Sequence, residues 1–170
     1  MLLYRDLNGA KVELSFEKRV FPIEPLHVLV IAKHQNKWLL TKHPKRGIEF
    51  PGGKIEGNET TVQGAIRETM EETNVSIENV EWIAEYLVHD VIPFCKAVFI
   101  AKVAHIIEEG TSFETDGPIW LTTEEFLTCE HLSFHMKDAG MQAILEKVIE
   151  HENKWNDRKD QSLSITKSTY

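Results

Sequence analysis

One helical segment, residues 60–73, stands between segments that have the pattern of β-strands, and this order constrains the fold most. Apolar residues are dense, or alternate with polar ones, in the segments 11–16, 26–34, 37–43, 80–92, 94–106 and 119–122. Asn58 is expected to be the N-cap of the helix, and Asn74 to end it in the left-handed conformation. A second, amphipathic helix is expected over 135–155. The pattern predicts an α/β fold, a mixed β-sheet covered by helices in a sandwich.

Length and charge narrow the class of protein. The 170 residues suit a single domain, which is predicted over 1–155 and is followed by a polar tail over 156–170. The net charge of −8 disfavours binding to duplex DNA, although a metal can bring a small anionic ligand to an acidic protein. The sequence contains neither an apolar run that could cross a membrane nor a secretory signal, so a cytoplasmic location is expected. The oligomeric state stays open.

The helix crowds Glu68, Glu71 and Glu72 into about 100° of its circumference, where like charges repel one another. Arg67 lies beside them and can pair with Glu71. The face expected to be buried lies opposite and consists of Val62, Ala65, Ile66, Thr69 and Thr73. Gly64, one turn before Glu68, is expected to leave open space above the carboxylates. A solvated acidic face is the commoner explanation of such a run, but Mg²⁺ bridging the carboxylates to substrate phosphates explains both the crowding and the glycine.

A longer window resembles a known motif. Gly53, Glu59 and the run 67–75 are similar to the Nudix box, G-x5-E-x7-R-E-U-x-E-E-x-G-U, in which U is a bulky apolar residue. Thr69 stands where the family prefers an aliphatic residue, and Asn74 stands where it prefers glycine. With the flanking segments EFPGGKIE, FETDGPIWL and SFHMKD, the chain most resembles the YtkD subgroup in the MutT-like branch of the Nudix hydrolase superfamily.

This resemblance implies a Nudix α/β/α sandwich and an enzyme that hydrolyses phosphoanhydride bonds with Mg²⁺ or Mn²⁺. The implied substrate is a nucleoside triphosphate, such as the oxidised guanine nucleotide 8-oxo-dGTP, which is cleaved to the monophosphate and pyrophosphate. Removal of pyrophosphate from triphosphorylated RNA 5′ ends is the alternative activity. A non-catalytic nucleotide-sensing module is the alternative from a different class, although such modules typically lose carboxylates of the box.

The resemblance also implies roles for individual residues. The implied metal ligands are Glu68, Glu71, Glu72 and the backbone carbonyl of Gly52. Glu68 is expected to be the general base, with Glu114 as the alternative. Arg67 is expected to orient the carboxylates, and Glu59 either to brace the turn before the helix or simply to favour the helix dipole.

Residues before the helix are expected to bind the substrate. They are Lys42, Arg46, Glu49, Phe50, Pro51, Gly52 and Gly53. For Lys42 and Arg46, a solvated loop charge is an equally good interpretation. For Phe50, a place in the hydrophobic core is equally open.

Overall fold

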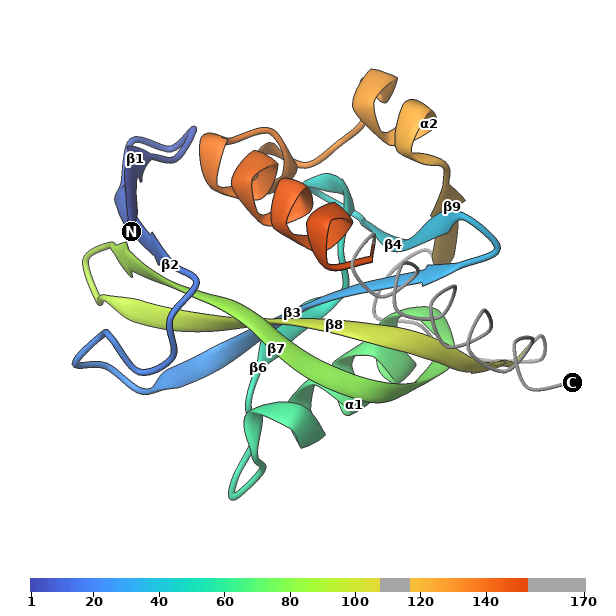
Figure 1. The fold of residues 1–170 in the computed structure, drawn as a ribbon, viewed down its shortest axis with the longest axis horizontal. Coiled ribbons are helices and arrows are strands. Elements are labelled where there is room, and N and C mark those ends of the chain that lie inside the picture. The colour runs from blue at the N-terminus through green and yellow to red at the C-terminus, as the bar shows by residue number, and fades with distance from the viewer. Residues whose placement is uncertain (108–116, 153–170) are drawn as a thin grey trace, which may run out of the picture.

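The computed structural model describes residues 1–107 and 117–152 (Figure 1). The strands are β1 (Leu2–Arg5), β2 (Lys11–Ser15), β3 (Pro25–His34), β4 (Lys37–His43), β5 (Gly47–Glu49), β6 (Gly52–Lys54), β7 (Val75–His89), β8 (Phe94–Ile106) and β9 (Pro118–Leu121). The helices are α1 (Thr61–Thr73), α2 (Thr123–Thr128), the short 3₁₀ helix η1 (Phe134–Met136) and a helix over residues 139–152. The tail predicted from residue 156 onward lies outside the described residues.

The strands form one mixed sheet in the order β1-β2-β7-β8-β3-β4-β5, with β6 paired to β3 and β9 paired to β4. The central strand, β3, runs parallel to β8 on one side, and on its other side it pairs first with β6 and then with β4. Gln35 and Asn36 join β3 to β4 with φ angles of 47° and 62°, a conformation that matches the twist of a two-residue hairpin. These two residues therefore form the turn of a β-hairpin.

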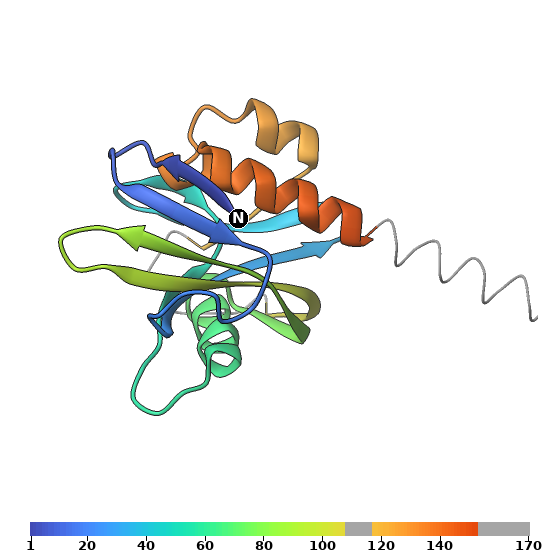
Figure 2. The same cartoon turned by 60° about the vertical axis from the view of Figure 1, so that its left-hand side comes forward.

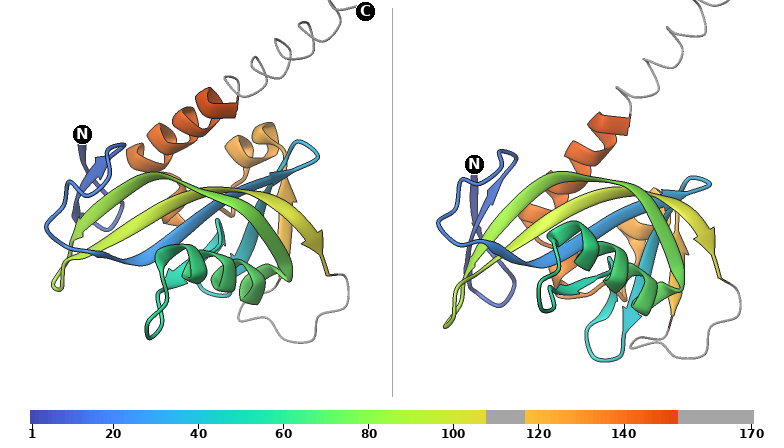
Figure 3. Two further views of the ribbon diagram at one scale, coloured as in Figure 1. Left: turned by 60° about the horizontal axis from the view of Figure 1, so that its bottom comes forward. Right: turned by 90° about the horizontal axis from the view of Figure 1, so that it is seen from below.

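Helices cover both faces of the sheet, as Figures 2 and 3 show from two sides. Val28 and Val30 of β3 belong to the core beneath α1, whereas Leu29 and Ile31 belong to the core beneath the 139–152 helix. Successive residues of a strand point to opposite faces, so one apolar strand supplies both cores. The predicted α/β sandwich is confirmed.

Helix α1 begins with a different cap from the one predicted. Thr60, and not Asn58, is the N-cap, because Thr60 Oγ1 accepts a hydrogen bond from Gln63 N at 3.2 Å and Gln63 Oε1 accepts one from Thr60 N at 2.9 Å. This reciprocal pair is a capping box, and the T-x-x-Q spacing was the signal for it. At the other end, Asn74 has φ 54° and ψ 30°, so the predicted left-handed end is confirmed.

The N-terminal hairpin contains a strand that the sequence pattern did not reveal. Leu2 and Tyr4 of β1 are partly buried while Leu3 is 60% exposed, so β1 forms because it pairs with β2 and not because of a strong apolar pattern. The Tyr4 ring lies directly against Gly140, where a Cβ atom would overlap the phenol. The hairpin therefore packs on the first turn of the 139–152 helix.

Candidate active site

Two glycines bring β6 onto α1. A Cβ atom at Gly53 would overlap the Glu68 carboxylate, and one at Gly52 would overlap the backbone of Val28. The Gly52 amide donates a hydrogen bond to Glu72 Oε2 at 3.1 Å. Only residues without a side chain allow this close approach of backbone to carboxylate.

The buried face of α1 differs from the predicted one. Of the residues expected to be buried, Ala65, Thr69 and Thr73 are buried, whereas Val62 and Ile66 are 37% and 39% exposed. Glu68 and Glu72 are buried instead, at 8% and 9% exposed, because the glycines of β6 cover that side of the helix. The Thr69 hydroxyl donates to the Ala65 carbonyl at 2.8 Å, which satisfies the polar group that stands at an aliphatic position of the box.

Gly64 faces the turn before the helix. A Cβ atom at Gly64 would contact Glu59 Oε2 at 3.4 Å and Ile55 Cγ1 at 3.5 Å. The space above this glycine is thus filled by residues of the chain itself, and the expectation of open space was wrong.

Arg67 joins the turn to the acidic helix face. Its guanidinium donates to both oxygens of Glu59, at 2.7 and 3.0 Å, and Nη1 donates to Glu68 Oε1 and Glu71 Oε2, each at 3.0 Å. These carboxylates raise the pKa of Arg67 above its ordinary value, and Glu59 contributes most. Glu59 Oε2 also accepts from the Glu56 amide at 3.0 Å. Of the two interpretations of Glu59, this geometry matches the bracing role.

The donor groups suit a hard divalent cation, although in this structure the carboxylates are turned toward other partners. No three His, Cys, Asp or Glu side chains within 1–107 and 117–152 are arranged around a common metal position. Glu68 and Glu71 are turned toward Arg67, and Glu72 toward the Gly52 amide. Buried carboxylates are costly unless a cation compensates them. Three carboxylates beside a bare glycine backbone match the oxygen ligands that Mg²⁺ prefers.

Arg46 and Glu49 form a bidentate ion pair at the turn before Phe50. Arg46 Nη2 lies 2.6 Å from Glu49 Oε1, and Arg46 Nε lies 3.2 Å from Glu49 Oε2. Burial opposes the charge of Glu49, but hydrogen bonds from Arg46 and Ser133 outweigh it and hold the pKa of the carboxyl below its usual range. Arg46 is therefore held by Glu49, while its side chain remains 40% exposed.

This ion pair predicts a pH dependence of stability. Because the pKa of Glu49 is lower in the folded state than in the unfolded chain, where it is about 4.3, the pair stabilises the fold above that pH. Its contribution should disappear as the pH falls through the folded value. In urea titrations between pH 7 and 3, the difference in unfolding free energy between wild type and Glu49→Gln should shrink below about pH 4.5. A difference that stays constant over this range would contradict the assignment.

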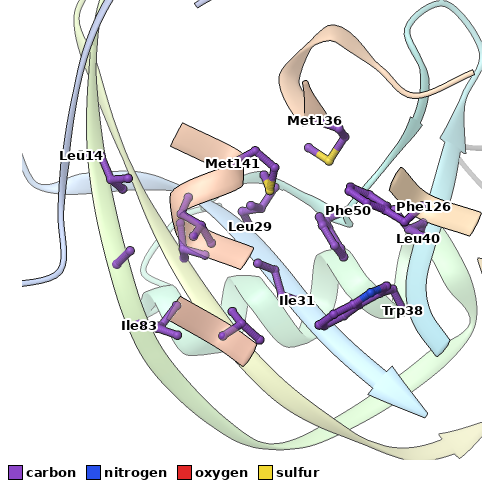
Figure 4. Packing of buried hydrophobic residues seen from close by; sticks show 14 of the residues in the cluster. Leu14, Leu29, Ile31, Trp38, Leu40, Phe50, Ile83, Phe126, Met136 and Met141 are labelled. Carbon is purple, nitrogen blue, oxygen red and sulfur yellow. The ribbon is translucent and has the colours of Figure 1, made fainter. Parts of the chain in front are cut away.

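Phe50 belongs to the hydrophobic core. Its ring is 2% exposed, and its centroid lies 5.6 Å from that of Phe126 and 6.2 Å from that of Trp38 (Figure 4). Pro51 is also buried, and its carbonyl accepts a hydrogen bond from Val30 at 2.9 Å. Of the two interpretations of Phe50, this position matches a place in the hydrophobic core.

Of the two remaining predicted residues, only Lys42 is part of what the structure describes. Lys42 is exposed near the end of β4, in register with Ile48. Glu114, the alternative general base, lies outside the described residues.

Lys96 of β8 is the residue of this region that the sequence analysis missed. Its charge interacts with those of Glu49, Arg46 and Glu72, and burial lowers the pKa of its ammonium group. His135 of η1 lies close enough for Lys96 to lower its pKa further, after burial, to about 4. A lysine inside the apolar run FCKAVFIAK was the available signal, because a charge within a buried strand usually has a partner.

None of the helices in the described parts of the chain is long and apolar enough to cross a lipid bilayer.

Known proteins resemble this chain over most of its length. The YtkD protein of Bacillus subtilis (strain 168), which is named for 8-oxo-dGTP diphosphatase activity, is 35% identical over 155 residues, which cover 88% of this chain and 97% of that protein. The crystal structure of the Bacillus subtilis pyrophosphohydrolase BsRppH superimposes with a TM-score of 0.82 at 33% identity and covers 89% of this chain and 98% of its own. A NUDIX hydrolase from Nitrosomonas europaea shares the fold, with a TM-score of 0.63 at 18% identity over 75% of this chain and 90% of its own.

The NUDIX domain model matches residues 24–146, a range that includes α1, the glycine turn and Lys96. The chain therefore belongs to the NUDIX family and is a hydrolase of phosphoanhydride bonds.

Proposed function

We propose that this protein hydrolyses nucleoside triphosphates to the monophosphate and pyrophosphate in the cytoplasm, with oxidised guanine nucleotides such as 8-oxo-dGTP among its substrates. The observation that carries the proposal is the burial of Glu68 and Glu72 beneath the glycines of β6, with Arg67 fixed beside them by Glu59. The YtkD relative, named for 8-oxo-dGTP diphosphatase activity, supports the choice of substrate.

The proposed metal site uses Glu68, Glu71, Glu72 and the carbonyl of Gly52. When bound, Mg²⁺ or Mn²⁺ would supply positive charge to the polyphosphate oxygens and acidify the attacking water. Glu68, which is nearly buried and beside Gly53, is the proposed general base and accepts the proton of that water. Arg67 holds Glu68 and Glu71 in place through its 3.0 Å contacts and does not itself contact phosphate in this proposal.

A second candidate activity is removal of pyrophosphate from triphosphorylated RNA 5′ ends. The similarity to BsRppH, a pyrophosphohydrolase, at 33% identity and a TM-score of 0.82 favours it. The net charge of −8 argues against a long RNA contact, but a short 5′ end needs little basic surface. A non-catalytic sensing module receives less support, because all three carboxylates of the box are present.

A comparison of substrates tests the proposal. Purified protein with Mg²⁺ is given 8-oxo-dGTP, dGTP, GTP or a 5′-triphosphorylated oligoribonucleotide, and pyrophosphate and single phosphate are measured separately. We expect pyrophosphate as the product and the highest kcat/KM on 8-oxo-dGTP. A higher kcat/KM on the oligonucleotide would favour the second candidate, and the absence of turnover on all four substrates would refute both.

A further inference from the structure

Three basic side chains cross the sheet in a row beside the glycine turn. Lys54 of β6 is in register with His27 of β3, and His27 is in register with Lys96 of β8, which lies opposite Tyr86 of β7. Residues in register on neighbouring strands point to the same face of the sheet. Lys54 and Lys96 thus lie on the same face on either side of His27, in a chain whose net charge is −8.

The two lysines affect the imidazole that lies between them. The pKa of His27 is lowered to about 4, first by burial and then by the charges of Lys96 and Lys54. Burial also lowers the pKa of Lys96, and the carboxylates of Glu49 and Glu72 only partly oppose this effect. An anion placed beside Lys96 would favour its charged form and oppose the effect of burial.

Lys96 also lines a cavity of about 50 Å³ together with Tyr4, Tyr86 and His135. Asp6, Val88, Phe94 and His135 line both this cavity and a second one of about 340 Å³, which lies between the β1–β2 and β7–β8 turns. The two cavities are therefore neighbours, and together they are called the groove below. Figure 1 shows both hairpins at the same end of the molecule. Lys96 therefore lines the groove together with aromatic rings.

The position of Lys96 between these features indicates what it binds. On one side, the row leads to Lys54 of β6, the strand whose Gly52 amide donates to Glu72 of the proposed metal site. On the other side, Lys96 acts on His135, which lines the groove. A nucleotide with its polyphosphate at the carboxylates and its nucleoside in the groove would place the phosphate nearest the nucleoside beside Lys96.

We propose that Lys96, held in the row with His27 and Lys54, binds the phosphate group that is attached directly to the nucleoside. This inference rests on the proposed function, which supplies the nucleotide. The alternative is that Lys96 has only a structural role, because its Nζ lies 5.8 Å from the centroid of the Tyr86 ring and can make a cation–π contact there. The third possibility, binding of the leaving pyrophosphate, shares the same phosphate chemistry and is separated by the test.

The test measures binding and not turnover. Calorimetric titrations with Mg²⁺ use guanosine 5′-monophosphate, guanosine and inorganic pyrophosphate as probes, and Lys96→Met, Lys96→Arg and Lys102→Met as variants. Lys102 is an exposed lysine of the same strand, so Lys102→Met makes the same change of charge outside the groove. We expect Lys96→Met to weaken monophosphate binding by about tenfold or more, the effect of losing a charge-assisted hydrogen bond. Guanosine binding should stay unchanged, Lys96→Arg should restore most of the affinity, and Lys102→Met should match wild type.

Several results would overturn the proposal. If Lys96→Met weakens the binding of the monophosphate and of guanosine equally and also lowers the melting temperature, the role of Lys96 is structural. If Lys96→Met weakens only the binding of pyrophosphate, Lys96 contacts the leaving group instead. If the wild-type protein does not bind the monophosphate, the proposal is refuted. Pyrophosphate release from 8-oxo-dGTP is measured separately. Lys96-dependent monophosphate binding without any release would refute the proposed function and leave this inference standing.

Discussion

Replacing Glu68 by Gln should lower kcat for pyrophosphate release by about 10²- to 10⁴-fold, the range lost when a positioned general base is removed. The side chain is 8% exposed and lies directly beneath Gly53. Gln has the same size, so it fills the same space, but it has neither the charge to hold a cation nor the basicity to accept a proton. Arg67 stays fixed by its two hydrogen bonds to Glu59, at 2.7 and 3.0 Å, so the surrounding structure should persist.

The matched control is Glu78→Gln, which makes the same change at an exposed position of β7 and should leave kcat unchanged. A Mg²⁺ titration separates the two roles of Glu68. If Glu68 contributes only to metal affinity, excess Mg²⁺ should restore the rate of Glu68→Gln. If it is the general base, saturating Mg²⁺ should leave the rate low. Unchanged pyrophosphate release in Glu68→Gln would show that Glu68 is not essential.

Features determined by local rules could be predicted from the sequence. The β3–β4 hairpin follows from Gln35 and Asn36, a short polar connection between two apolar segments. Their positive φ angles in the structure fit a two-residue turn. The end of α1 follows from the tolerance of Asn74 for the left-handed conformation. The alternation of Val28 and Leu29 between two cores follows from the period of a strand. Each of these inferences needs only neighbouring residues.

Features determined by contacts between distant segments could not be predicted. A helical wheel places Glu68 opposite the apolar residues, but whether that side is buried depends on the turn at Gly53, 15 positions earlier in the chain. Arg67 was expected to pair with Glu71, and it does, but its contact with Glu59 spans eight residues, beyond the reach of one helical turn. The same limit explains why Lys96 was missed, since its neighbours on β3 and β6 are set by strand register.

The ambiguity at Phe50 also depends on such distant contacts, and it can be tested directly. Replacing Phe50 by Ala should lower the free energy of unfolding by about 3–5 kcal/mol, the cost of removing a buried aromatic ring. The ring is 2% exposed and packs between Trp38 and Phe126, so its removal would leave a cavity that the flanking rings cannot fill. Urea denaturation measures the loss. Phe16→Ala is the control, and because Phe16 is 37% exposed it should cost less than about 1 kcal/mol.

Kinetics on the same variants separate a core residue from a substrate-binding one. Phe50→Leu keeps an apolar side chain of similar size, so it should retain most of the stability and leave KM for the nucleotide unchanged. A residue that stacked on the nucleoside would behave in the opposite way, with a large rise in KM and a small loss of stability. Because Phe50 lies between Glu49 and Pro51, its burial fixes the segment that leads into the glycine turn. We therefore expect the folded fraction of Phe50→Ala to show a larger fall in kcat than rise in KM, because the turn that covers Glu68 would be less firmly held.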